Sequence, residues 1–216
     1  MFSIIIPTMW RSNKTLKLLT DLQASKLVGE IILIDNDPNF INVKIESFDK
    51  IKYFPQAENI YVNPAWNLGV EKAKHNMLCI CNDDINFNVD AYLQYVISHE
   101  DQMGVFGSNY RPFGIKKDDM LIELKTDLSK RAAIQGNGFG MLMFLKKENW
   151  IPIPENIKIW FGDNWIIGSH TVAYSMELID NIDADTHVTA KSVNLRPVIR
   201  SDMDAWNKLS SPFKNF

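Results

Sequence analysis

Three short apolar runs, each closed by polar residues, constrain the fold of this 216-residue chain more than any other feature. They cover residues 3–6, 30–34 and 77–81 and are rich in isoleucine and other residues that favour buried strands. Helical patterns lie between them, and the first has leucines on one helix face between residues 16 and 22. Strands that are apolar throughout and alternate with helices favour an α/β fold, in which helices cover both faces of a mainly parallel sheet.

The other elements follow from weaker patterns of the same kind. Further strands are predicted at 52–54, 60–62, 105–108, 141–145, 179–182 and 188–190, and further helices at 63–74, 91–99, 146–150 and 165–175. Aromatic and polar residues alternate in the tail from residue 197 to 216, which is expected to order only on binding. No linker or low-complexity tract divides the chain, which favours a single domain over residues 1–216.

The composition is typical of a folded globular protein, with 46% hydrophobic and 23% charged residues. The formal net charge is −3, so no strong overall field draws the protein to nucleic acid or to an anionic membrane. Cys79 and Cys81 are predicted to be buried thiols in a reducing compartment, and a Cys-x-Cys metal site is the alternative. Without a signal peptide or a membrane-spanning run, a cytoplasmic protein is expected, in the host cytoplasm if the chain is viral.

Polar residues follow each of the three strong strands. They are Pro7 with Thr8, the segment 35–37, and the run 82–84 that reads Asn-Asp-Asp. In open α/β sheets the ligand crevice lies beyond the carboxyl ends of the strands, where these residues are expected to meet. Acidic oxygens on a tight turn suit a hard divalent cation that is shared with phosphates. A cap for the following helix is the alternative interpretation of Asp83 or Asp84.

Taken in order, six segments of the chain resemble the family 2 glycosyltransferases of the GT-A type. These segments are 3–8, 32–36, 67–76, 78–85, 161–165 and the stretch from His187 to Ser192. The resemblance implies a three-layer, Rossmann-like nucleotide-diphospho-sugar transferase fold with a central, mainly parallel sheet. It also implies a nucleotide-binding half over 1–100, an acceptor and catalytic half over 101–196, and a C-terminal tail over 197–216.

The resemblance also implies roles for single residues. It places the nucleotide-sugar donor against Pro7, Thr8, Asp35, Asn36, Asn67, Asn82, Asp83 and Gly136. Asp84 and His187 are expected to hold Mn²⁺ or Mg²⁺ against the donor diphosphate, and a surface or core histidine is the alternative for His187. The glycine at 136 either lets the backbone approach the donor sugar or serves a bulge before the next strand.

Asp163 is the candidate general base, which takes the proton from the acceptor hydroxyl as that oxygen attacks the anomeric carbon. One base on the face opposite the leaving group implies inversion at that carbon. A helix cap is the alternative for Asp163. Two departures from the family pattern matter: Asn82 stands where the metal motif commonly begins with Asp, and Asp163-Asn164 stands where the later motif commonly reads Glu-Asp.

The predicted function is a metal-dependent transfer of a sugar, from a nucleotide sugar such as a UDP-sugar, to an acceptor hydroxyl. The expected acceptor is a surface glycan or a hydroxymethylated DNA base, although the segment 111–131 has only six basic against four acidic residues. Trp160 or Trp165, which flank Asp163, is expected to stack on the acceptor.

Two other functions remain open from the sequence. The first is a nucleotidyltransferase, which makes sugar nucleotides. Such an enzyme usually has a glycine-rich phosphate loop after its first strand, and the absence of glycine from residues 7–11 counts against it. The asparagines at 82 and 164 keep open a sugar-nucleotide-binding module that has lost catalysis.

Overall fold

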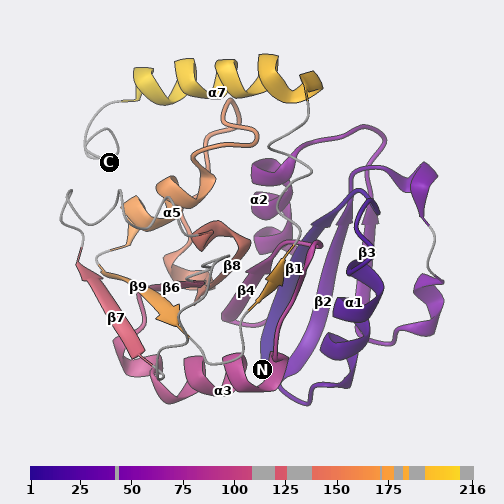
Figure 1. The fold of residues 1–216 in the computed structure, drawn as a ribbon, viewed down its shortest axis with the longest axis vertical. Helices are drawn as coiled ribbons and strands as arrows, with labels where there is room; N and C mark the ends of the chain where they lie inside the picture. Colours follow the sequence, from indigo (N-terminus) through magenta and orange to yellow (C-terminus); the bar gives the residue numbers. More distant parts are fainter. Residues whose placement is uncertain are drawn as a thin grey trace.

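A computed structural model describes residues 1–41, 44–108, 120–125, 138–170, 172–177, 182–184 and 193–209 (Figure 1). The strands are β1 (Phe2–Thr8), β2 (Val28–Asp35), β3 (Ile51–Pro55), β4 (Met77–Cys81), β5 (Ile85–Asn86), β6 (Val105–Ser108), β7 (Met120–Lys125), β8 (Leu142–Lys146), β9 (Val172–Glu177) and β10 (Asp183–Ala184). The α-helices are α1 (Thr15–Ala24), α2 (Val62–Lys72), α3 (Val89–Ser98), α5 (Gly162–Ser169) and α7 (Arg196–Lys208), and the 3₁₀ turn η4 covers Phe139–Met141.

Eight of these strands form one sheet in the order β3-β2-β1-β4-β8-β6-β9-β7. The four strands β3, β2, β1 and β4 are mutually parallel, as the sequence predicts. β8 runs antiparallel between β4 and β6, and β9 is parallel to β6. The carboxyl ends of β1, β2, β3, β4 and β6 therefore lie at one edge of the sheet, together with the amino end of β8.

Helices cover both faces of the sheet, which confirms the predicted three-layer α/β architecture. Successive residues of β1 point to opposite faces: Ile4 and Ile6 pack with the leucines of α1 and with α3, whereas Ile5 packs with α2, α5 and α7. Figure 1 shows α7 above α2 and α5, and α3 at the opposite end of the molecule. No helix among the described residues combines the length and the apolar character that a bilayer span requires.

One glycine sets how closely α2 approaches the sheet. A Cβ added at Gly69 would lie 2.2 Å from Cγ2 of Ile5 on β1, which is far inside van der Waals contact. Only glycine therefore allows α2 to pack on β1 at this distance. The segment 67–69, which reads Asn-Leu-Gly, thus contributes to the packing of α2 on the sheet.

Several element predictions differ from the structure. The strand predicted at 60–62 is absent, because Tyr61 has a φ of 68° and α2 begins at Val62. The helix predicted over 165–175 begins at Gly162 and ends at Ser169, and β9 follows. The tail is ordered as α7 up to Lys208, because Ala205 and Trp206 are buried against the sheet layer. The strand predicted at 188–190 lies outside the described residues, as does most of the one at 179–182.

Candidate active site

The polar residues at the ends of β1, β2 and β4 meet at one edge of the sheet. Thr8 pairs with Asp35 in the parallel register of β1 and β2, directly after the pair of Pro7 with Ile34. The Thr8 hydroxyl donates a hydrogen bond of 2.6 Å to Oδ2 of Asp83, 75 residues later in the chain. The backbone amide of Asn36 donates a hydrogen bond to the backbone carbonyl of Thr8 at 2.9 Å. The structure therefore brings the three strand-end segments together, as the parallel sheet predicts.

Asp35 is fully buried, and donors from this chain occupy its carboxylate. Its Oδ2 accepts hydrogen bonds from Trp10 Nε1 at 2.7 Å and from the Tyr53 hydroxyl at 2.6 Å. Its Oδ1 accepts from the Asp37 amide at 2.9 Å. Burial and the bond to Asp35 together raise the pKa of Tyr53 well above its ordinary value. Asp35 therefore fixes two aromatic side chains at the edge where the donor is expected.

Sequence reasoning did not assign Trp10 and Tyr53 to the site. Trp10 comes two residues after the end of β1 and has a φ of 59°, in the left-handed region. Tyr53 lies in the weakly patterned strand β3. The sequence shows only that Trp10 and Tyr53 are aromatic residues close to strand ends. It does not show that both side chains donate hydrogen bonds to Asp35.

The turn at residues 82–84 is anchored to its neighbours through its backbone. The Asn82 amide donates to the Met141 carbonyl at 2.9 Å, and the Thr15 hydroxyl donates to the Asp83 carbonyl at 3.0 Å. Burial raises the pKa of the Asp83 carboxyl, and the Thr8 hydroxyl bond partly opposes this. Asp84, which is half-buried, directly precedes β5, whose Ile85 pairs with Ala184 of β10.

These donors match the chemistry of a hard divalent cation. Asn82, Asp83 and Asp84 supply carboxylate and amide oxygens on one tight turn. The described part of the chain contains no cluster of three or more His, Cys, Asp or Glu side chains that could hold a metal by itself. Mg²⁺ typically keeps one or two protein carboxylates and takes its other ligands from phosphates and water. The turn fits that shared kind of site. The predicted residues His187 and Gly136 lie outside the described residues.

Asp163 lies in the first turn of α5, and η4 connects it to the strand-end residues. Its Oδ1 accepts a hydrogen bond of 2.9 Å from the backbone amide of Asn164. A Cβ added at Gly140 in η4 would lie 3.2 Å from Asp163 Oδ2. The same turn ends at Met141, whose carbonyl binds Asn82. One short turn thus contacts both the acidic turn after β4 and the candidate base.

Burial raises the pKa of the Asp163 carboxyl above its ordinary value. A carboxylate with a raised pKa is a stronger proton acceptor, which suits a general base. Asn164, in the second position of the motif, is a buried residue with only 9% of its surface exposed. Asp163 is half-buried and is therefore the more accessible of the two.

We expect Asp163→Asn to raise the free energy of unfolding at neutral pH. Burial raises the pKa of Asp163 in the folded protein above its value in the unfolded chain. Stability linked to a raised pKa is present below the unfolded pKa and is lost as the pH rises through the folded pKa. Relative to the wild type, Asp163→Asn should therefore show no gain in the free energy of unfolding below the unfolded pKa. The gain should grow between the unfolded and the folded pKa and stay constant above the folded pKa. Urea unfolding at a series of pH values measures it, and an equal gain at every pH would contradict the argument.

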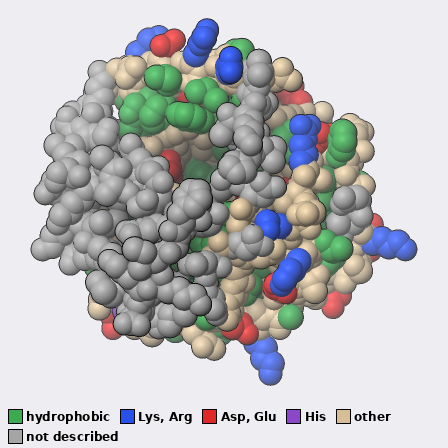
Figure 2. Space-filling model, in the orientation of Figure 1, with side chains coloured by type: hydrophobic (Ala, Val, Ile, Leu, Met, Phe, Trp, Pro, Cys, Tyr) green, Lys and Arg blue, Asp and Glu red, His purple; other side chains and the backbone are tan. Residues whose placement is uncertain are grey.

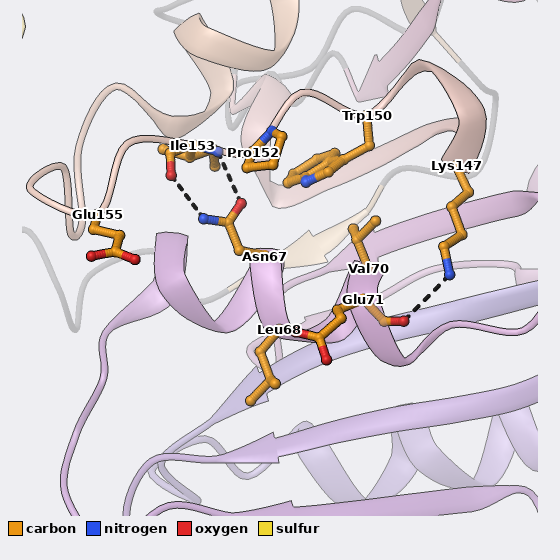
Figure 3. Close-up of a pocket in the computed structure, with 9 residues that line it drawn as sticks. All are labelled: Asn67, Leu68, Val70, Glu71, Lys147, Trp150, Pro152, Ile153 and Glu155. Carbon is orange, nitrogen blue, oxygen red and sulfur yellow. Dashed lines mark hydrogen bonds between the residues drawn. The ribbon is translucent and has the colours of Figure 1, made fainter.

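Asn67 lies in a separate groove of about 520 Å³ between α2 and the segment that follows β8 (Figure 3). Its Nδ2 donates to the Ile153 carbonyl at 2.8 Å, and its Oδ1 accepts from the Ile153 amide at 2.9 Å. The groove is lined by Asn67, Leu68, Val70, Glu71, Lys147, Trp150, Pro152, Ile153 and Glu155. This lining includes none of the strand-end residues, so the structure does not bring Asn67 together with them.

The two tryptophans beside Asp163 have different environments. Trp165 is 8% exposed, and its Nε1 donates to the Ile151 carbonyl at 3.1 Å. Trp160 is 46% exposed, as is Met203 of α7. Figure 2 shows hydrophobic side chains gathered on the face near α7. Of the two rings, that of Trp160 is the one available to a ligand.

Comparison with known proteins identifies the family and the fold of the chain. The model of the family described as "Glycosyl transferase family 2" matches residues 3–182. Staphylococcus aureus TarS 1-349 in complex with UDP-GlcNAc has a similar structure, with a TM-score of 0.71 and 12% identity over 99% of this chain and 68% of that one. GalNAc-T7 with UDP, GalNAc and Mn²⁺ gives a TM-score of 0.63 and 13% identity over 99% of this chain and 49% of that one.

The similarity covers only part of these larger proteins. The chain spans 58% of one S. aureus TarS 1-349 structure and 41% of another TarS structure, which has a TM-score of 0.65 and 14% identity over 99% of this chain. Identities this low show a shared fold. No curated protein matches the sequence significantly.

Proposed function

The chain belongs to glycosyl transferase family 2 and has the GT-A fold of the glycosyltransferases that it resembles, and from this we propose that it transfers a sugar from a nucleotide sugar to an acceptor hydroxyl. The observation that carries the proposal is the meeting of Thr8, Asp35 and Asp83 at the carboxyl ends of three parallel strands. Ligands of open α/β sheets bind at this edge. Similar structures contain UDP-GlcNAc, or UDP with Mn²⁺, which supports a UDP-sugar as the donor.

The donor diphosphate would lie against the turn at residues 82–84. In this proposal Asp84, with Asp83 or Asn82, holds Mn²⁺ or Mg²⁺ there, and His187 remains a predicted third ligand. When bound, the cation would neutralise the charge that develops on the departing diphosphate. The Thr8 hydroxyl holds Asp83 in place, because it donates to that carboxylate at 2.6 Å.

The strand ends of β1 and β2 would form the nucleoside side of the site. Pro7 and Thr8 shape it, and Asp35 orients Trp10 and Tyr53 through hydrogen bonds of 2.7 and 2.6 Å. The Asn36 side chain accepts from the Ile60 amide at 3.2 Å and so fixes the loop before α2. The half-buried ring of Tyr53 would contact the nucleoside, with the buried ring of Trp10 behind it. Gly136 remains a predicted contact of the donor sugar.

Asp163 would act on the acceptor side. Its carboxylate takes the proton from the acceptor hydroxyl while that oxygen forms the new bond to the anomeric carbon. The bond between the anomeric carbon and the diphosphate oxygen breaks in the same step, and its electrons leave with the nucleotide diphosphate. A single displacement of this kind inverts the anomeric carbon. The exposed ring of Trp160, three residues before the base, supports a sugar hydroxyl on a glycan as the acceptor.

The test is nucleotide-dependent stabilisation followed by a search for turnover. UDP and Mn²⁺ together should raise the melting temperature more than either does alone, because ligands that bind only the folded state stabilise it. A panel of UDP-sugars should then show slow UDP release with water, and faster release with a glycan acceptor. Stabilisation without any UDP release would indicate a binding module. Faster UDP release with hydroxymethylated DNA than with a glycan would indicate that the acceptor is nucleic acid. If no nucleotide stabilises the protein, the proposal is contradicted.

A further inference from the structure

The backbone immediately before Asp163 is held in an unusual conformation. Phe161, a bulky aromatic residue, has a φ of 65°, in the left-handed region that such residues rarely adopt. Strained backbone persists only where the surrounding structure determines it, and it is concentrated at functional sites. The residues that hold this segment therefore bear on the orientation of the candidate base.

Asp202 of α7 binds this segment from one side. Its side chain is fully buried, and its two oxygens accept hydrogen bonds from three consecutive backbone amides. The amide of Lys158 donates to Oδ1 at 2.9 Å, and the amides of Ile159 and Trp160 donate to Oδ2 at 2.7 and 2.9 Å. Hydrogen bonds to a carboxylate are stronger than those to a neutral acceptor. Asp202 therefore fixes the path of the backbone over residues 158–160.

Asn63 of α2 binds the same segment from the other side. Its Nδ2 donates to the carbonyls of Ile157 and Trp160 at 3.2 and 3.1 Å. A Cβ added at Gly162 would lie 2.0 Å from Asn63 Oδ1, so residue 162 has no room for a side chain. The backbone of residues 157–160 therefore has hydrogen bonds to side chains of both α2 and α7.

The ring of Phe161 gives a further contact to α7. It stacks on the ring of Trp206 with the centroids 5.0 Å apart and an angle of 9° between the planes. Asp202 and Trp206 are one helical turn apart, so they lie on the same face of α7. This face therefore contacts residues 158–160 through Asp202 and residue 161 through Trp206. Both contacts fix the chain shortly before Asp163.

We propose that Asp202 is a positioning residue for the transfer reaction, which orients the Asp163 carboxylate by holding the backbone at residues 158–160. The inference rests on the proposed function, in which Asp163 is the base. The family match ends at residue 182, so α7 and Asp202 lie beyond the part of the chain that defines the family. Two residues, Phe161 and Gly162, separate the last amide that Asp202 holds from the base itself.

The chemistry of the contact requires a carboxylate. Two acceptor oxygens can take three N–H donors, whereas an asparagine offers one oxygen and would turn its own N–H₂ group toward a backbone amide. Asp202→Asn should therefore loosen residues 158–160 at nearly constant side-chain volume. Asp204→Asn is the matched control, because Asp204 is exposed on the same helix.

The experiment measures kcat and donor KM for hydrolysis of the UDP-sugar that the wild type hydrolyses fastest, together with hydrogen–deuterium exchange. Asp202→Asn should lower kcat about 10- to 100-fold, because small errors in placing a catalytic group cost this much. Donor KM should stay within about twofold of the wild-type value, since the donor binds at the strand ends rather than at this segment. The amides of residues 158–160 should exchange faster, and Asp204→Asn should change none of these values.

The outcomes separate this inference from the proposed function. A wild-type kcat in Asp202→Asn, with faster exchange at 158–160, would overturn the positioning role and leave a structural contact only. A wild type that binds UDP but releases none from any UDP-sugar would overturn the proposed function itself. If Asp202→Asn does not fold, Trp206→Leu loosens the same face of α7 through Phe161, and an unchanged kcat in that variant would overturn the inference.

Discussion

Asp163→Asn should lower the rate of sugar transfer by about 10²- to 10⁴-fold, the usual contribution of a general base. Asn cannot accept the proton of the acceptor hydroxyl, although its oxygen can still accept the Asn164 amide bond that Asp163 Oδ1 makes at 2.9 Å. The donor affinity should not change, because the proposed donor site lies at the ends of β1, β2 and β4. Steady-state kinetics with the best UDP-sugar and acceptor, combined with calorimetry of UDP binding, separates the two effects.

Glu155→Gln is a matched control for this variant. Glu155 is an exposed carboxylate eight residues before Asp163, and its loss should leave the transfer rate unchanged. Transfer by Asp163→Asn near the wild-type rate would assign the base to another group. A loss of UDP affinity equal to the loss of rate would instead place Asp163 in the donor site.

Asp84→Asn should remove the effect of Mn²⁺ on UDP binding. The substitution leaves Asn82 and Asp83 as oxygen donors on the turn but takes away one of its two carboxylates. Loss even of residues that only orient metal ligands typically costs 10- to 100-fold in metal affinity or activity, so the dissociation constant for UDP with Mn²⁺ should rise at least about tenfold. Isothermal titration with UDP, with Mn²⁺ and with a chelator, measures this.

Asp49→Asn is the control for the change in charge. Asp49 is exposed and precedes β3, so it lies at the amino end of the parallel strands, opposite the proposed site. It should bind UDP with Mn²⁺ as the wild type does. If Asp84→Asn binds UDP as tightly as the wild type in the presence of Mn²⁺, the metal assignment is wrong.

The parallel half of the sheet could be predicted because its signals are local. The segments 4–6, 31–34 and 77–81 are each apolar through their length, and each lies in a buried strand of the sheet. The carboxyl ends of parallel strands share one edge, so the meeting of Thr8 with Asp83 followed from the topology. Local pattern and tertiary arrangement agree in this half of the chain.

The partners of single polar residues could not be predicted in the same way. The pattern places Asn67 on a helix but does not say which segment that helix face contacts, and its partner, Ile153, is 86 residues away. Asp35 was expected to face the ligand, whereas Trp10 and Tyr53 occupy its oxygens. Such contacts depend on the packing of distant elements, which periodicity does not encode.

The C-terminal helix carried a signal that the sequence analysis did not use. Asp202, Ala205 and Trp206 are spaced as one helix face, and Pro197 stands in the first turn of the helix, where proline is favoured. The acidic residue within an otherwise apolar stripe obscured the pattern. The structure explains it, because Asp202 is buried to accept three backbone amides and not to face solvent.

The most direct test of the central claim is a crystal structure of this chain with UDP and Mn²⁺. The anomalous signal of manganese should lie within coordination distance of the Asp84 carboxylate, with the diphosphate beside it and the nucleoside near Trp10 and Tyr53. A nucleotide bound instead in the groove lined by Asn67 and Trp150, or a metal ion away from residues 82–84, would contradict the account.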